Sequence, residues 1–69
     1  MKIIFTEHAK DRMKRRGMSE EEIIYAIKNS NKTLKIGGKY YAQKDIGRAK
    51  IEVVYMKDKY IKIITIYHL

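Results

Sequence analysis

The chain has 69 residues, no cysteine, and 16 Lys and Arg residues against eight Asp and Glu residues, which gives a formal net charge of +8. This length allows one domain, residues 1–69, with a thin core, because so small a domain buries only about 60% of the surface that its unfolded chain exposes. The lack of cysteine excludes disulfides and thiolate metal sites, and we expect a cytoplasmic location. The positive charge attracts polyanions such as nucleic acid, although a Lys-rich surface of a heat-adapted protein has the same composition.

The hydrophobic pattern bears on membrane association. The longest apolar run, residues 63–67, is far too short to cross a bilayer. The N-terminus has neither the apolar block nor the small-residue cleavage site of a signal peptide. We therefore expect no membrane partner.

The first structural signal is a helix over residues 6–17. Residues 1–5, M-K-I-I-F, fit either a short opening strand or a segment that packs under this helix. Thr6 can cap the helix, Gly17 can end it in a left-handed conformation, and the residues between them are good helix formers. The pattern predicts a helix of about three turns.

The faces of this first helix differ in chemistry. At roughly 100° per residue, His8, Arg12 and Arg15 share one stripe, with Arg16 at its flank. The neighbouring stripe carries Ala9 and Met13. One side can therefore pack on a core, while the other presents an imidazole among guanidinium groups, whose planar forks match phosphate oxygens.

A second helix is predicted from about Glu20 to Asn29. Ser19 and Glu22 form a capping-box pattern at its start, and the acidic residues there suit the positive end of the helix dipole. Its buried face is expected to contain Ile23, Ile24, Ala26 and Ile27.

From Thr33 onward the pattern alternates as in strands. Residues 33–36 and 39–43 flank Gly37 and Gly38, which can adopt the positive φ angles of a two-residue hairpin turn. Residues 49–56 and 60–68 are the strongest strand signals. The prediction is an α+β domain with two N-terminal helices on one face of an antiparallel sheet of about four strands.

The register of the last two strands decides what each sheet face carries. If residues 57–59 form a three-residue loop, Val53 faces Ile63, and Ile51 faces Thr65. The helix-bearing face then consists of Ile51, Val53, Tyr55, Ile61, Ile63, Thr65 and Tyr67. The other face carries Val54, Met56, Tyr60, Ile64 and Ile66, with Glu52 and Lys62 near them. We expect this apolar face to be covered, either by a partner protein or in a homodimer through Val54, Met56, Ile64 and Ile66.

The polar residues favour chemistry without metal or other cofactors. The two histidines, His8 and His68, lie at opposite ends of the chain, and no metal-ligand or phosphate-loop motif is present. RNA cleavage through the 2′-hydroxyl needs only a base, an acid, and cations around the phosphate. The catalytic candidates are His8, Arg12, Arg16 and Tyr67, with His68 as a further candidate. The candidates for binding phosphate are Lys10, Lys14, Arg15 and Arg48.

A sequence motif supports this interpretation. Residues Phe5 to Ile23 follow the pattern F-T-x-H-A-x-x-R-M-x-x-R-G-M-S-x-E-E-I, and residues 65–67 read T-I-Y. The pattern resembles a family of small prokaryotic domains of unknown function, grouped with the RelE/ParE-like toxins among the barnase, colicin and RelE-type nucleases. The resemblance implies two N-terminal helices on an antiparallel sheet, metal-independent RNA cleavage, and restraint by an antitoxin. It carries over His8, Arg12 and Arg16 as polar site candidates.

Three functional hypotheses follow. The first is a toxin-like, metal-independent endoribonuclease of a toxin-antitoxin system, with His8 as base or acid and with Arg12 and Arg16 on the scissile phosphate. The second is a non-catalytic nucleic-acid-binding module that uses the same basic residues. The third is a protein-interaction module that uses the exposed sheet face. The first hypothesis requires the imidazole and the two guanidinium groups to converge in an open hollow.

Overall fold

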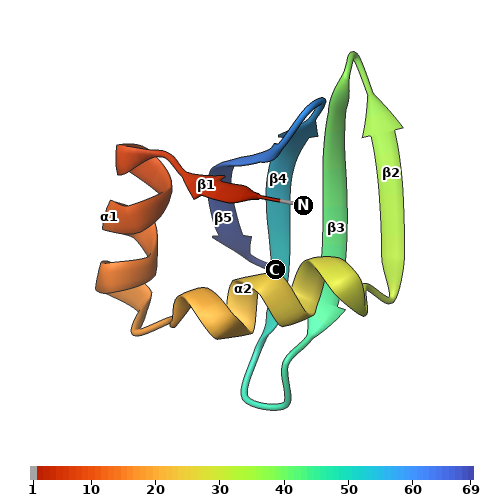
Figure 1. Ribbon diagram of the computed structural model, residues 1–69. Helices are drawn as coiled ribbons and strands as arrows, with labels where there is room; N and C mark the ends of the chain where they lie inside the picture. The colour runs from red at the N-terminus through yellow and green to blue at the C-terminus, as the bar shows by residue number, and fades with distance from the viewer. Residues whose placement is uncertain (1) are drawn as a thin grey trace.

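A five-stranded sheet with two helices on one side forms the fold (Figure 1), in a computed structural model that describes residues 2–69. In chain order the elements are β1 (Ile3–Phe5), α1 (Glu7–Arg16), α2 (Glu20–Lys28), β2 (Lys32–Ile36), β3 (Lys39–Asp45), β4 (Lys50–Lys57) and β5 (Ile61–His68). The strands lie in the order β1-β5-β4-β3-β2. The predicted α+β class with two N-terminal helices is confirmed, and the opening segment adds a fifth strand, which runs parallel to β5.

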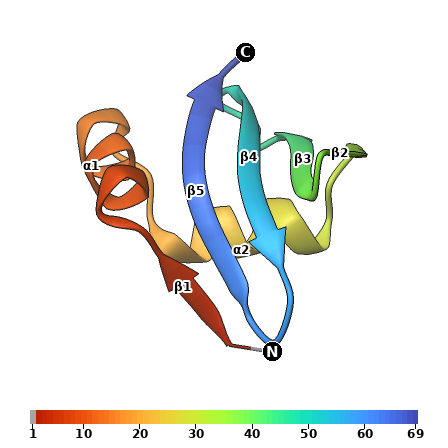
Figure 2. The same cartoon turned by 90° about the horizontal axis from the view of Figure 1, so that it is seen from above.

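The two helices form where their capping residues predicted them. Thr6 caps α1 by accepting a hydrogen bond from the Ala9 backbone N–H, and Gly17 ends the helix with φ 63°. Both hydrogen bonds of the capping box between Ser19 and Glu22 are present at the start of α2. In Figure 1, α2 crosses in front of β4 and β3, and Figure 2 shows α1 alongside β5, beyond the end of β1. Among residues 2–69, no helix is long and apolar enough to span a membrane.

The core lies between the helices and one sheet face. Its fully buried side chains include Ile23 from α2, Ile51 and Val53 from β4, and Ile63 from β5. Ala9 and Met13 of α1 belong to the same cluster, as their shared stripe predicted. The opposite face of the sheet is not covered by a helix (Figure 2), and we call it the open face.

The register of β4 and β5 differs from the predicted one in two ways. The loop between them is residues 58–60, which displaces the pairing by two residues, and a bulge in β5 displaces it by one more. Val54 pairs with Thr65, but the next residue of β4, Tyr55, pairs with Ile63, so Ile64 is an extra residue in β5. Because successive strand residues point to opposite faces, one extra residue exchanges the faces of everything beyond it. The expectation that Thr65 and Tyr67 lie on the helix-bearing face is therefore wrong, because both lie on the open face.

The same bulge alters the expected apolar surface. Ile66 lies opposite Val53, on the helix-bearing side, and is only 3% exposed as part of the core. Val54 does face the open side, but it is 4% exposed between its cross-strand neighbours Tyr41 and Thr65. The expectation that Val54 and Ile66 are exposed is wrong, whereas Met56 is exposed and Ile64 is partly so. A homodimer through this face stays a prediction, with Met56 and Ile64 but without the buried Val54 and Ile66.

Candidate nucleic-acid interface

Thr6 fixes the position of α1 against β5. Its backbone N–H donates to the carbonyl of Ile63 at 3.1 Å, and its hydroxyl donates to the carbonyl of Ile64 at 3.0 Å. Thr6 thus binds two successive carbonyls of β5. In a regular strand successive carbonyls point in opposite directions, so this arrangement requires the bulge at Ile64. The same hydroxyl accepts from Ala9 as the helix cap, at 3.1 Å. The first turn of α1 is therefore bound to the bulge.

Two side chains of α1 reach the open face as a result. Nε2 of His8 lies 3.0 Å from Oγ1 of Thr65. One helical turn later, the guanidinium carbon of Arg12 lies 5.8 Å from the centre of the Tyr67 ring. Four helix residues advance about 6 Å and two strand residues about 6.7 Å, so successive turns of α1 meet successive open-face residues of β5. We call this line of contact the seam, and it is formed by His8 and Arg12 of α1 with Thr65 and Tyr67 of β5. The structure therefore brings together three predicted site residues, His8, Arg12 and Tyr67.

Each of these contacts continues across the sheet as a row of paired residues on the open face. We call the first the histidine row, and it consists of Leu34, Tyr41, Val54, Thr65 and His8. The second, the arginine row, consists of Lys32, Gln43, Glu52, Tyr67 and Arg12. The histidine row is largely apolar and aromatic, whereas the arginine row alternates charged and uncharged side chains.

Glu52 adds a carboxylate that was not among the predicted site residues. It lies directly opposite Tyr67, and its Oε2 accepts a hydrogen bond from Nε2 of Gln43 at 3.0 Å. Thr65, its diagonal neighbour, is roughly 7–8 Å away in an antiparallel ladder. The sequence did place Glu52 on the sheet face opposite the helices. Its place beside Tyr67 depends on the bulge, which the alternating pattern of β5 does not indicate.

The remaining basic residues of α1 differ in their surroundings. Arg16 is exposed, one turn beyond Arg12 on the same side of the helix. Lys14 is also exposed, and Nζ of Lys10 lies 3.8 Å from Glu7. Nε of Arg15, which was predicted on the stripe of His8, lies 3.0 Å from Asp11. His8 and Arg12 therefore contact a hydroxyl and an aromatic ring, whereas Lys10 and Arg15 contact carboxylates.

Two predicted residues lie elsewhere. Arg48 donates to both carboxylate oxygens of Glu22, at 2.8 and 2.9 Å, and to the carbonyl of Gly17 at 3.2 Å. The hydrogen bond from the Ser19 backbone and the one from Arg48 both lower the pKa of Glu22 below its ordinary value. Arg48 thus joins the turn between the helices to the β3–β4 loop. His68 pairs with Ile51, on the helix-bearing side, and is separate from His8.

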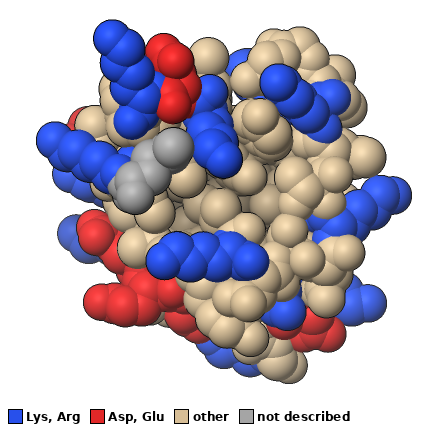
Figure 3. All heavy atoms as spheres, turned by 45° about the vertical axis from the view of Figure 1, so that its right-hand side comes forward, with Lys and Arg blue, Asp and Glu red and all other residues tan. Residues whose placement is uncertain are grey.

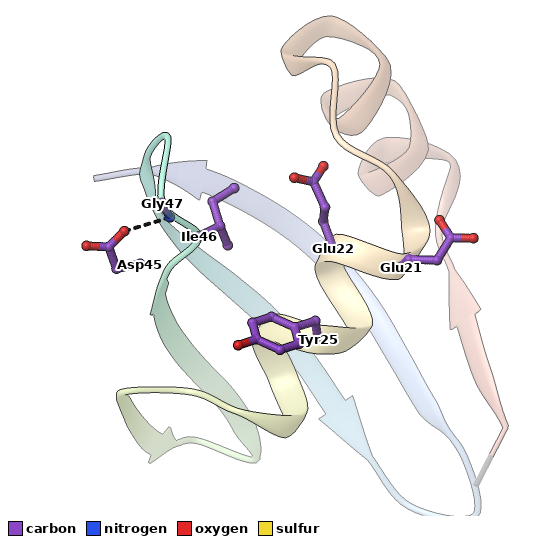
Figure 4. A pocket seen from close by; sticks show the side chains of 6 residues that line it. All are labelled: Glu21, Glu22, Tyr25, Asp45, Ile46 and Gly47. Atoms are coloured by element: carbon purple, nitrogen blue, oxygen red, sulfur yellow. Dashed lines mark hydrogen bonds between the residues drawn. The ribbon is translucent and has the colours of Figure 1, made fainter.

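A pocket of about 460 Å³ lies on the helix-bearing side, between α2 and the loop after β3 (Figure 4). Its lining consists of Glu21, Glu22, Tyr25, Asp45, Ile46 and Gly47. Glu22 and Tyr25 project from α2 toward the loop, in which the Gly47 N–H donates to Asp45 at 2.8 Å. Three carboxylates make this pocket unsuited to phosphate. Two smaller pockets are lined by other residues than His8, Arg12 and Arg16.

Figure 3 shows how charge is distributed over one side of the molecule. In the face shown in Figure 3, acidic side chains gather mainly at the lower left, and Lys and Arg side chains are spread around a broad uncharged area. Among residues 2–69, no three acidic or histidine side chains are grouped so that they could hold a metal ion.

Comparison with known proteins identifies one family. Its model, described as a domain of unknown function (DUF4258), matches residues 5–68, which is nearly the whole chain. No curated protein and no solved structure matches the chain.

Proposed function

Since this chain belongs to the DUF4258 family of domains of unknown function, we propose its function from the site itself. The protein is a basic, toxin-like RNA-binding protein of the RelE/ParE type that binds single-stranded RNA on the open face. It cleaves that RNA without a metal ion. In this proposal it acts in the cytoplasm, and an antitoxin protein restrains it by covering the same face.

One observation carries the proposal: His8 and Arg12 stand one helical turn apart above Thr65 and Tyr67, and their observed contacts are not with carboxylates. A guanidinium stacked on a ring keeps its N–H donors for phosphate oxygens. Tyr67 is 44% exposed and offers a ring for a base. Arg16, one turn farther along α1, extends the positive seam.

The reaction needs two proton-transfer groups at this seam. A base takes the proton of the 2′-hydroxyl while its oxygen forms a bond to phosphorus, and the bond from phosphorus to the 5′-oxygen breaks as an acid protonates that oxygen. The products are a 2′,3′-cyclic phosphate and a 5′-hydroxyl. His8 supplies one of the two groups, and Glu52 or Tyr67 supplies the other. Arg12 and Arg16 stabilise the charge that builds on the phosphate.

The test is RNA cleavage in the presence of a chelator. Purified protein is incubated with labelled single-stranded RNA and EDTA, and the ends of the fragments are analysed. We expect 2′,3′-cyclic phosphate ends, and a loss of at least about 100-fold in rate for His8→Ala, since acid-base groups contribute about 10²- to 10⁴-fold. His68→Ala is the matched control, because it removes the other histidine from the opposite side of the sheet. Equal cutting by wild type and His8→Ala would show that a contaminant cuts the RNA.

A second candidate function is RNA binding without cleavage. It is favoured because none of the three pockets described above is lined by His8, Arg12 or Arg16, the groups that would have to surround the phosphate during cleavage. In that case RNA stays intact, the dissociation constant rises steeply with salt, and Arg12→Ala weakens binding. Arg15→Ala is the control, because Arg15 is already paired with Asp11. Absence of both binding and cleavage would leave the third hypothesis, a protein-interaction module.

A further inference from the structure

The strand β2 forms one edge of the sheet. It pairs with β3 on one side, and among residues 2–69 no strand lies on its other side (Figure 1). All five of its residues, Lys32–Ile36, are exposed. At the opposite edge, β1 is only three residues long, and α1 lies against the part of β5 beyond it. The long uncovered edge of the sheet is therefore β2.

The hairpin turn determines which backbone groups of β2 face outward. Gly37 and Gly38, with φ 57° and 80°, form a two-residue turn closed by the pair Ile36 and Lys39. The closing pair of such a turn is hydrogen-bonded, and hydrogen-bonded pairs alternate along an antiparallel ladder. Thr33 and Lys35 consequently direct both their N–H and their C=O groups away from β3. They form a ready edge for another strand.

The side chains near this edge indicate the charge of a partner. Residues 23–44 contain five lysines and no acidic residue. Four of these lysines, Lys32, Lys35, Lys39 and Lys44, belong to the hairpin of β2 and β3, and the first three lie in β2 or next to its turn. On the open face, Leu34 and Ile36 are 43% and 61% exposed. The edge thus combines free backbone groups, positive charge and two apolar side chains.

We propose that the outer edge of β2 binds an extended, acidic segment of a partner protein, which adds to the sheet as a sixth strand. The free groups of Thr33 and Lys35 hold its backbone, the lysines pair with its carboxylates, and Leu34 and Ile36 contact its apolar side chains. A second copy of this chain is a poorer occupant, because pairing two β2 edges brings two lysine-rich hairpins together. This site is separate from the seam of α1 and β5.

The experiment uses the intact protein labelled with ¹⁵N and three capped eight-residue peptides. The first alternates Glu and Val, the second has the same charge but Pro in place of two Val residues, and the third alternates Lys and Val. We expect the first peptide alone to bind and to slow amide hydrogen exchange at Thr33 and Lys35. Equal binding of the Pro-containing peptide would overturn the proposal, because charge alone would then explain it. Protection at other residues in place of these two would also overturn it.

Two substitutions of Lys35 separate the contribution of its backbone N–H to peptide binding from the contribution of its charge. Lys35→Ala removes the charge and keeps the outward N–H, whereas Lys35→Pro removes both, and proline is tolerated on an edge strand. We expect Lys35→Pro to bind the acidic peptide about tenfold more weakly than Lys35→Ala. If Lys35→Pro disrupts folding, Thr33→Pro against Thr33→Ala makes the same comparison. Equal affinities, or a homodimer of the free protein that the Pro substitution dissociates, would contradict the proposal. His8→Ala should leave peptide binding unchanged, so this result is independent of RNA cleavage.

Discussion

Replacing Thr6 with valine tests how α1 is fixed to the sheet. Valine keeps the shape of threonine and lacks the hydroxyl, so the variant loses the cap on the Ala9 N–H and the hydrogen bond to the Ile64 carbonyl. Loss of a cap costs about 0.5–2 kcal/mol, and loss of the second bond about 0.5–1.5 kcal/mol. We expect the free energy of unfolding to fall by about 2 kcal/mol, and Tm by about 8–16 °C in a domain of this size.

The assay is urea unfolding followed by circular dichroism, with Tm as a second measure. Thr6→Ser is the control, because it keeps the hydroxyl and removes only a methyl group from a half-buried position. It should be much closer to wild type than Thr6→Val is. If the two variants are equally stable, the hydroxyl does not hold α1 to the bulge. The explanation given above for the positions of His8 and Arg12 would then be refuted.

Two further predictions concern the helix ends. Glu22→Gln should flatten the dependence of stability on acidic pH: the folded-state pKa of Glu22 is lowered from 4.5, so its contribution is present above that value and is lost as pH falls through the folded-state pKa. Urea unfolding at pH 7 and pH 3 checks this, and an unchanged difference between the two pH values would contradict it. Gly17→Ala should cost about 1–2 kcal/mol because the residue has φ 63°. Apart from the local backbone, no atom lies within 4 Å of an added Cβ, so backbone strain alone is responsible. Gly17→Asn should cost less, since Asn tolerates this conformation better, and a larger loss for Asn would contradict this reasoning.

The local features of the fold could be predicted from the sequence. The caps at Thr6 and Gly17 and the capping box of Ser19 and Glu22 are formed by residues at most three or four positions apart. The turn at Gly37 and Gly38 depends on two adjacent residues with positive φ. In each case neighbouring residues supply the geometry, so a short stretch of sequence is sufficient.

The candidate site could be predicted only in part, because it depends on contacts between distant segments. His8 and Arg12 were identified from one helix, but their partners Thr65 and Tyr67 are more than 50 residues away. The bulge that turns those partners to the open face requires Ile64 to be an extra residue, and nothing in the alternating pattern signals it. Arg48 likewise looked available for phosphate, whereas it is 26 residues from its partner Glu22.

The most direct test of the account follows the ring signals of the two histidines by NMR while single-stranded RNA is added. The account predicts that the ring signals of His8 shift with RNA concentration, because its imidazole lies at the RNA-binding seam beside Thr65. The ring signals of His68, on the helix-bearing side, should stay in place. Shifts confined to His68, or RNA binding that moves neither histidine, would contradict the assignment of the seam between α1 and β5 as the RNA site.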